Sequence, residues 1–351
     1  MSESCQFMAA RLSFIGNNSA ALKSFSRGFG VNKNVPTKKD SDVVKNFYTY
    51  PASKYILEHV GNSQIVMINE AHHVPAHRNF TKQLLKTLYG KGFRYLGCEG
   101  VSSNDGLLQQ RKYCTFNSGT YIKEPQYSNM INYAIKVGFK IFAYDYGNFN
   151  NREKTQAENI IRILKQDSNA KIIVHAGWGH IREDTASKAM AFWFQKLSHI
   201  NPFTINQARM IEETRSEYEN PVYQCIKQKI KEPSVLLNKK NKSLYIASDS
   251  ITDVMIFHPK TQTKNGRPVW LFKDTTMTKK IIKPNVKTLP VIFVVYNDNN
   301  PQSVPIDIFE LNKPSKKITL FFPHKGNFTV SGYDSNYKVV YKKSVTENGV
   351  E

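Results

Sequence analysis

The feature that most constrains the fold is a regular alternation of short β-forming runs and helical stretches between residues 64 and 197. Apolar runs typical of strands occupy 64–68, 93–98, 140–144 and 171–174. Stretches with apolar residues at helical spacing occupy 76–89, 128–137, 152–165 and 185–197. This alternation favours an α/β fold, with a mostly parallel central sheet flanked by helices.

The composition changes after about residue 230, where helical periodicity fades and short β-type runs follow one another. They are 243–246, 254–257, 269–272, 291–296, 318–322 and 337–341, with an Asn265-Gly266 turn signal between two of them. We expect the first of these runs to complete the central sheet. The later ones predict a small β-rich C-terminal unit.

These patterns predict three parts in a chain of 351 residues. Residues 1–40 are rich in Ser, Lys and Arg and are expected to be a flexible basic segment. Residues 41–275 are expected to form the α/β domain with an active-site cleft, starting with a helix capped at Ser41-Asp42 that runs to about Val60. Residues 276–351 would be the β-rich unit.

Ionisable residues follow several of the predicted strands at equivalent places. Glu70, Glu99, Asp145 and His175 each come just past an apolar run. The carboxyl ends of parallel strands meet at one edge of a sheet, where open α/β folds bind ligands. Two histidine-rich loops, 69–78 and 175–183, lie at these ends. The sequence therefore predicts a polar cleft above the sheet.

The residue types in this cleft allow two kinds of chemistry. Imidazole and carboxylate together suit Zn, Mn, Fe or Co, so His72, Glu99, His180 and Glu70 are candidate ligands of a divalent metal. Without a metal, a histidine could act as a general base that a carboxylate orients, while Arg78 or Arg152 stabilises negative charge. No Gly-x-Ser-x-Gly elbow is present, which argues against an α/β-hydrolase serine nucleophile.

Other residues of the two loops are candidates for substrate binding. His77 and Arg78 lie in the first turns of the predicted helix 76–89, Asp145 follows a strand, and Trp178 lies between Gly177 and Gly179. Each has an ordinary structural alternative. His77 and Arg78 could be solvated, Asp145 could cap a turn, and Trp178 could cover the sheet edge.

Three segments together resemble a known superfamily. The run Ile68-Asn69-Glu70-Ala71-His72-His73, followed by Gly92-Phe93 and a strand ending in Glu99, looks like the start of erythromycin esterase-like and ChaN-like proteins. Residues 151–160, which begin Asn-Arg-Glu, resemble the Arg-Asp motif of that superfamily. Residues 174–180 resemble its later strand with a Gly-x-x-His loop. The related TraB and Tiki-type proteins pair such motifs in matching places. The resemblance covers about residues 60–200.

The resemblance implies a cleft in which six residues are catalytic: Glu70, His72, His73, Glu99, Arg152 and His180. Members include esterases that open macrolide lactones, metallopeptidase-like proteins and a haem-uptake lipoprotein. We therefore expect a hydrolase that activates water to cleave an ester, lactone or amide, with or without a divalent metal. A protein that binds haem or another ligand without turnover is the alternative. Asn69 stands in place of the usual Gly, and the functional histidine is either His72 or His73.

The net charge of +21 suggests anionic partners, but its distribution argues against a nucleic-acid module. The basic residues are scattered, with no long basic tract beside stacking aromatics, so a small-molecule or peptide substrate is expected. A basic anchoring protein is a third reading.

The four cysteines form no CxxC pair. No clear signal peptide or transmembrane segment is found, which leaves the protein cytoplasmic, or exported if a signal was removed. The oligomeric state stays open.

Overall fold

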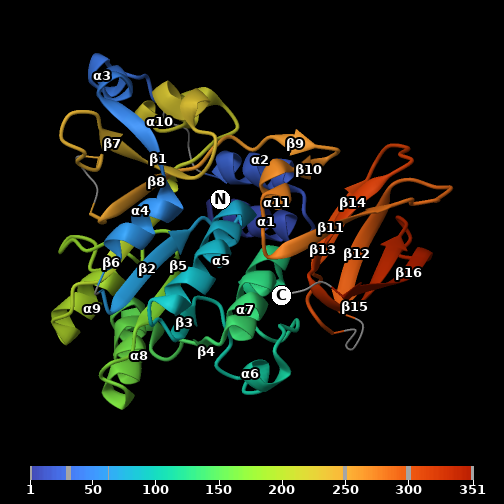
Figure 1. Ribbon diagram of the computed structural model, residues 1–351, viewed down its shortest axis with the longest axis horizontal. Coiled ribbons are helices and arrows are strands. Elements are labelled where there is room, and N and C mark those ends of the chain that lie inside the picture. Colours follow the sequence, from blue (N-terminus) through green and yellow to red (C-terminus); the bar gives the residue numbers. More distant parts are fainter. Residues whose placement is uncertain (1, 29–32, 62, 248–250, 298–301, 349–351) are drawn as a thin grey trace.

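The computed structural model describes residues 2–28, 33–61, 63–247, 251–297 and 302–348, and confirms the α/β class (Figure 1). Its largest sheet has the strand order β1-β7-β8-β6-β2-β5-β3-β4. The strands are β1 (Phe47–Pro51), β2 (Ile65–Glu70), β3 (Tyr95–Cys98), β4 (Lys140–Phe142), β5 (Ile172–Gly177), β6 (Phe203–Met210), β7 (Ser234–Asn238) and β8 (Val254–Phe257). All neighbours from β8 to β4 are parallel, whereas β7 runs antiparallel to both β8 and β1.

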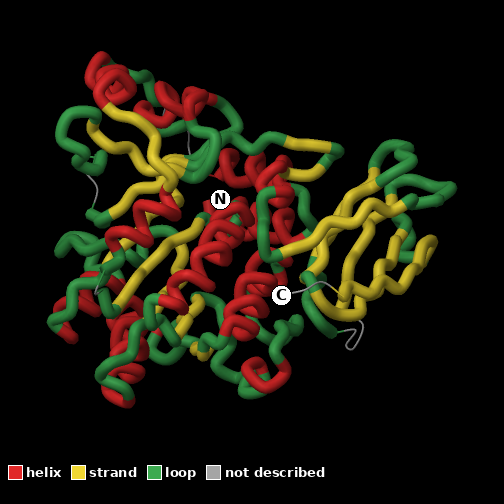
Figure 2. The backbone as a smooth tube through the Cα atoms, in the orientation of Figure 1, coloured by secondary structure: helices red, strands yellow, loops and turns green. Residues whose placement is uncertain are grey.

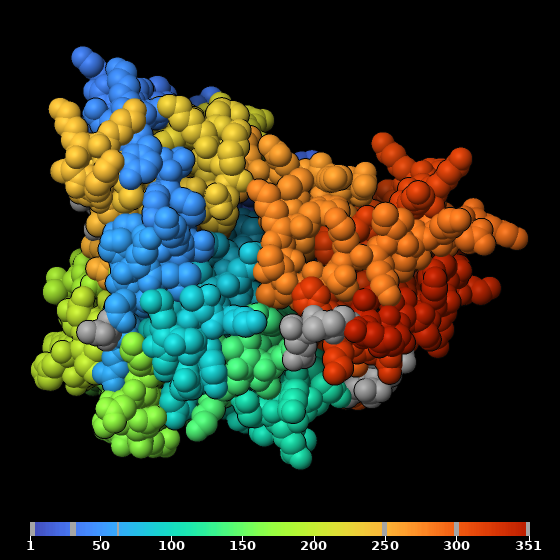
Figure 3. Space-filling model, in the orientation of Figure 1, coloured from blue at the N-terminus to red at the C-terminus, as the bar shows by residue number. Residues whose placement is uncertain are grey.

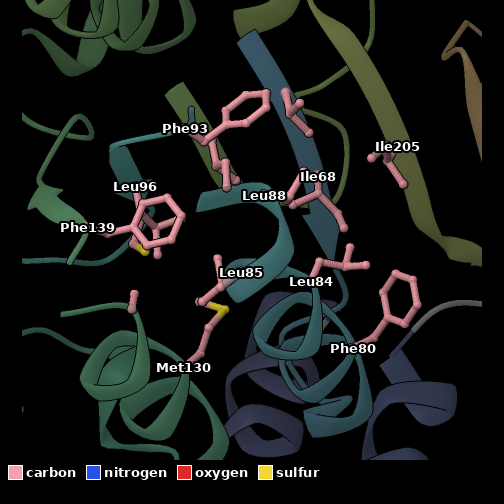
Figure 4. Close-up of a cluster of buried hydrophobic side chains, with 14 of the residues drawn as sticks. Ile68, Phe80, Leu84, Leu85, Leu88, Phe93, Leu96, Met130, Phe139 and Ile205 are labelled. Atoms are coloured by element: carbon pink, nitrogen blue, oxygen red, sulfur yellow. The ribbon is translucent and has the colours of Figure 1, made fainter. Parts of the chain in front are cut away.

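Helices cover both faces of this sheet, as Figure 2 shows. Alternate residues of β2 face opposite layers: Val66 and Ile68 belong to one hydrophobic cluster, and Ile65 and Met67 to another. The first cluster includes residues of α4 (Ala52–His59), α5 (Pro75–Gly90) and α7 (Pro125–Val137); Figure 4 shows part of it. The second includes residues of α8 (Arg152–Gln166) and α9 (Met190–Ser198). Burial on both faces explains the continuous apolar runs of β2 and β5.

The helix predicted from residue 41 to about Val60 is wrong in its extent. Thr37 caps α3 (Lys38–Asn46) through a capping box with Asp40, and α3 ends before β1. Helix α4 follows β1. The segment Tyr48-Thr49-Tyr50 consists of β-forming residues and pairs with β7. Strand pairing at the sheet edge therefore overrides the local helical pattern.

Residues 2–28, expected to be part of a flexible segment, form two helices instead. Helices α1 (Ser2–Phe14) and α2 (Asn18–Gly28) lie near the centre of Figure 1. They bury Ala9, Ala10, Ala21 and Phe25. The ring of Phe25 stacks on His73 at a centroid distance of 4.0 Å, which attaches α2 to the loop after β2. Part of the expected segment, residues 29–32, lies outside the described residues.

Two strand assignments in the second half of the chain are also wrong, and several strands there, including β6 and β7, were not predicted. Residues 269–272 form the short helix α11 (Val269–Phe272), with Pro268 at its N-cap. The run 243–246 contributes only a bridge between Leu244 and Leu237. Strand β6, which follows Pro202, was missed. The Asn265-Gly266 turn is confirmed, because both residues have positive φ and join β9 (Thr263–Lys264) to β10 (Arg267–Pro268).

The chain ends in the predicted β-rich region, coloured orange to red in Figure 1. Its strands are β11 (Met277–Ile282), β12 (Val291–Asn297), β13 (Asp307–Leu311), β14 (Ile318–Pro323), β15 (Lys325–Tyr333) and β16 (Val339–Asn348). Strand β11 pairs with β14, and the other four pair in the order β13-β12-β15-β16. All these pairings are antiparallel, and the strands enclose a separate hydrophobic cluster. No helix of the described chain is long and apolar enough to cross a bilayer.

Candidate functional site

The candidate site lies where three neighbouring parallel strands end. Strands β2, β5 and β3 are adjacent in the sheet, and the register aligns Glu70 of β2 with Gly177 of β5. Glu99 directly follows β3 and donates its backbone N–H to the carbonyl of His175 on β5. Because the strands run the same way, residues far apart in sequence meet at one edge of the sheet.

Glu70 is the most heavily bonded carboxylate of this edge. Its Oε2 accepts from Arg78 Nε at 2.5 Å, and its Oε1 accepts from Arg78 Nη2 at 2.6 Å. His72 Nδ1 lies 2.8 Å from Oε1, and His175 Nε2 lies 2.9 Å from Oε2. Burial alone would raise the pKa of Glu70. The charge of Arg78 and the hydrogen bonds from the two histidines outweigh burial and hold that pKa well below its ordinary value.

Arg78 connects this carboxylate to a second buried acid. Its Nη1 donates to Glu124 Oε2 at 3.0 Å, and the same oxygen accepts the backbone N–H of Tyr127 at the start of α7. The side chains of Arg78, Glu70 and Glu124 are at most 3% exposed. Arg78 is therefore a buried structural cation rather than a solvated one, and it does not face solvent as a substrate-binding residue would.

Glu99 is the centre of a second, more open group of charges. Its Oε1 accepts from Arg152 Nη2 at 2.9 Å, and its Oε2 accepts the backbone N–H of Gly177. Asp145 holds Arg152 in place, with contacts of 2.9 Å to Nε and 2.6 Å to Nη2. Burial would raise the pKa of Glu99, but the positive charges of His180 and Arg152 lower it. Glu99 is therefore ionised at neutral pH.

His180 lies between two carboxylates at the open side of this group. Its Nε2 is 3.5 Å from Glu99 Oε1, and its Nδ1 is 2.7 Å from Glu153 Oε1. The ring is not aligned for a linear hydrogen bond to Glu153, so that contact is an ion pair. Burial would lower the pKa of His180, but the charges of Glu99 and Glu153 outweigh it and raise the pKa to about 10. His180 is therefore an imidazolium at neutral pH.

His72 links the two carboxylate groups. Because Glu70 is ionised, the short contact to Nδ1 requires Nδ1 to carry a proton, so the Nδ1–H tautomer is the neutral form that this contact selects. Nε2 lies 4.0 Å from Glu99 Oε1, a separation that one bridging water can span. The ring of Tyr121 stacks on His72 at a centroid distance of 4.0 Å and fixes its plane.

Three predicted site residues lie outside this cluster. His73 stacks on Phe25, which also stacks on Trp178 at 5.1 Å. His77 is fully buried, and its Nδ1 accepts the backbone N–H of Ala71. Burial lowers the pKa of His73 to about 3. These histidines are therefore neutral and separate from the paired carboxylates.

Asn69, in the place where a glycine was expected from the family resemblance, joins the two histidine-rich loops. Its Nδ2 donates to the carbonyl of Trp178 at 2.6 Å, and its Oδ1 accepts the backbone N–H of Gln207 at 2.8 Å. The backbone N–H of Trp178 in turn donates to the carbonyl of Glu70. The amide side chain thereby fixes the loop that carries His180 against β2 and β6.

The sequence did not assign a site role to several residues of the cluster. Glu124 could have been recognised as a helix cap, because it precedes Pro125 at the start of α7 and its side chain accepts from the first turn. Glu153 lies beside Arg152 in the motif quoted above, but nothing in the sequence indicates that it contacts His180. Tyr121 lies between the predicted strand 93–98 and the predicted helix 128–137, and no sequence pattern marks it.

The arrangement does not fit a metal ion bound by the expected ligands. Among the residues that the structure describes, no three or more His, Cys, Asp or Glu side chains are placed to hold one. Both oxygens of Glu70 accept hydrogen bonds from Arg78, and Glu99 accepts one from Arg152. A cation bound to these carboxylates would meet two guanidinium groups at close range.

Comparisons with known proteins add little to this geometry. No protein-family model matches the chain, and no curated protein matches it. Among solved structures, the chain is similar to that of the type III effector HopBA1, with a TM-score of 0.33 and 12% sequence identity. The match covers 54% of this chain and 94% of that one. So distant a likeness carries no functional argument, and the function is argued from the site.

Proposed function

We propose that the protein is a hydrolase that activates water by general acid–base catalysis to cleave an ester, lactone or amide. The observation that carries the proposal is the position of two histidines, His72 and His180, on either side of one ionised carboxylate, Glu99. His72 Nε2 lies 4.0 Å from Glu99 Oε1, and the protonated His180 lies 3.5 Å from the same oxygen. A base and an acid on one carboxylate form the minimal machinery for hydrolysis.

His72 is the proposed base. A water held between its Nε2 and Glu99 transfers a proton to Nε2 as its oxygen attacks the substrate carbonyl. The resulting imidazolium is stabilised by Glu70, which lies 2.8 Å from Nδ1 and remains ionised. We therefore assign the base role to His72, which lies at Glu70 and Glu99, rather than to His73, whose ring stacks on Phe25.

Arg152 and His180 are proposed to act on the oxyanion and on the leaving group, respectively. Arg152 has 37% of its side chain exposed, more than any other charged group that contacts Glu99, so it is placed to meet the substrate oxyanion. His180 would then donate its proton to the leaving oxygen or nitrogen as the carbonyl re-forms. The proton accepted by His72 returns to solvent or to His180, which restores both groups.

The same residues do not need a metal in this scheme. Arg152 supplies the positive charge that a Lewis acid would otherwise provide. The mechanism agrees in reaction type with the esterases that the sequence resembles. Binding of haem or another ligand without turnover is the competing proposal, and it requires no particular protonation state of His180.

The test is turnover of an ester and lactone panel by the purified full chain. The panel would hold p-nitrophenyl acetate, p-nitrophenyl butyrate, a simple γ-lactone and a macrolide lactone, all at neutral pH. We expect His72→Asn and His180→Gln each to lower kcat by about 100-fold or more on any substrate that is cleaved. His59→Gln, on the exposed face of α4, is the matched control and should leave kcat unchanged.

Two outcomes would contradict the proposal. Turnover that survives in both variants would show that the cleaving group lies elsewhere. Absence of turnover across the panel, together with a ligand that binds the wild type and both variants equally, would favour the binding protein.

A further inference from the structure

A cavity of about 580 Å³ lies beside the candidate site and plays no part in the mechanism proposed for it. It is enclosed by α2, the first half of α5, residues 227–233 and residues 258–273. These segments meet on the face of the molecule shown in Figure 3. The volume is in the range of pockets that bind small organic molecules. His72, Glu99 and His180 are not among its lining residues.

The inner end of the cavity carries a polar group without a partner. His73 is 3% exposed, and neither of its ring nitrogens has a hydrogen-bond partner within the described part of the chain. Burial holds its pKa at about 3, so the ring is neutral and offers one donor and one acceptor. A buried polar group left unpaired costs free energy, and a ligand atom placed in the cavity would remove that cost.

The walls of the cavity are mostly apolar. Phe80 and Leu84 of α5 line it together with Ile211, Ile230 and Trp270. His258, whose pKa burial lowers to about 3, adds a second neutral ring. The amides of Asn79 and Gln83 are the polar groups of the α5 wall. Such a surface suits an aromatic or aliphatic body with few polar atoms.

The rim of the cavity is cationic. Four lysines line it, against two glutamates, Glu212 and Glu232. Lys227 is engaged by Glu219, and Lys273 donates to the carbonyl of Lys231. Lys231 and Lys260 are exposed at the rim, where their ammonium groups can meet an anion.

We propose that this cavity binds an amphipathic organic anion. Its apolar body would lie against Phe80 and Trp270, a polar atom would pair with His73, and its negative group would meet Lys231 and Lys260. The proposal goes beyond the hydrolytic function and does not depend on it, because binding can be measured without turnover.

The test compares two fluorescent probes that share an aromatic body and differ in charge. Anilinonaphthalene sulfonate carries an anion, and phenylnaphthylamine is its neutral counterpart. We expect the folded full chain to bind both saturably at one site. The double variant K231Q/K260Q should lower the affinity for the anionic probe by about tenfold and leave the affinity for the neutral probe unchanged. Trp270→Ala should lower the affinity for both probes.

Control measurements separate the cavity from general surface charge. The matched double variant K316Q/K317Q removes two exposed lysines between β13 and β14 and should leave both affinities unchanged. Inorganic phosphate at millimolar concentration should not displace the anionic probe, because it has no apolar body. Thermal melts would verify that each variant is folded.

Three results would overturn the proposal. The first is an equal loss of affinity for the anionic probe in both double variants, which would indicate that the probe binds to general surface charge. The second is full displacement by phosphate, which would indicate a simple anion site. The third is the absence of saturable binding of either probe.

Discussion

Arg78 on α5 donates two hydrogen bonds to Glu70 at the end of β2, and both side chains are at most 1% exposed. The pair closes the loop between strand and helix, so that His72, which lies inside that loop, has a fixed position. It also brings a full negative charge next to the Nδ1 of His72. The same buried ion pair therefore supports the fold and sets the tautomer of the proposed base.

Glu70→Gln should lower the free energy of unfolding by about 3–5 kcal/mol, because it leaves Arg78 buried with half of its compensating charge removed. Urea denaturation followed by circular dichroism would measure the change. Glu58→Gln, on the exposed surface of α4, is the control and should change stability by less than about 1 kcal/mol. A loss as small as that of the control would show that the Glu70–Arg78 pair contributes little to the fold.

The raised pKa of His180 predicts a dependence of stability on pH. The folded chain binds this proton more tightly than the unfolded chain, whose histidine titrates near the ordinary value of 6.5. The contribution of His180 to the free energy of unfolding is therefore complete below about pH 6.5. It is lost as the pH rises toward about 10. The free energy of unfolding changes through this one group by at most about 1.4 kcal/mol per pH unit.

The measurement is the difference in unfolding free energy between the wild type and His180→Gln from pH 6 to pH 10. Lysines and tyrosines titrate in both proteins and cancel in the difference. We expect the stability advantage of the wild type to shrink with rising pH. A difference that is constant over this range would mean that His180 is not held protonated by Glu99 and Glu153.

Gly177→Ala should impair the site through a direct clash. A Cβ atom at this position would lie 2.5 Å from His72 Nε2 and 2.8 Å from Glu99 Oε2. Since real Cβ atoms do not approach so closely, His72 or Glu99 must shift, and we expect turnover to fall by at least about tenfold. Gly179→Ala is the control in the same loop, because its nearest contact would be Arg182 Cδ at 3.6 Å. Equal activity in the two variants would contradict the placement of His72.

Removal of metal should leave the protein active. Two arginines bond to the carboxylates that were expected to bind a metal ion, so dialysis against a chelator should not change turnover. Elemental analysis for Mn, Fe, Co and Zn should find less than one equivalent of each. A stoichiometric metal that is lost in His180→Ala would instead establish the metal-dependent alternative.

Much of the α/β domain could be predicted from the sequence, because its central strands are buried on both faces. The apolar runs of β2, β3 and β5 and the helical periodicity of α5 and α8 are local patterns. The end of β3 just before Glu99 followed from the same patterns, but β2 and β5 extend to Glu70 and Gly177, so Glu70 and His175 lie within their strands rather than just past them. Edge strands are less evident: β1 owes its form to pairing with β7, which is nearly two hundred residues away.

The sequence by itself determined the class of fold and the edge of the sheet at which the ionisable residues gather, because both depend on local hydrophobic periodicity and on strand direction. Only the tertiary structure decided which of two adjacent histidines meets Glu99. Successive residues of a loop can face opposite ways, and the charges of Glu70 and Arg78 and the ring of Phe25 separate His72 from His73. The protonation of His180 was likewise decided in three dimensions, by Glu99 from β3 and Glu153 from α8.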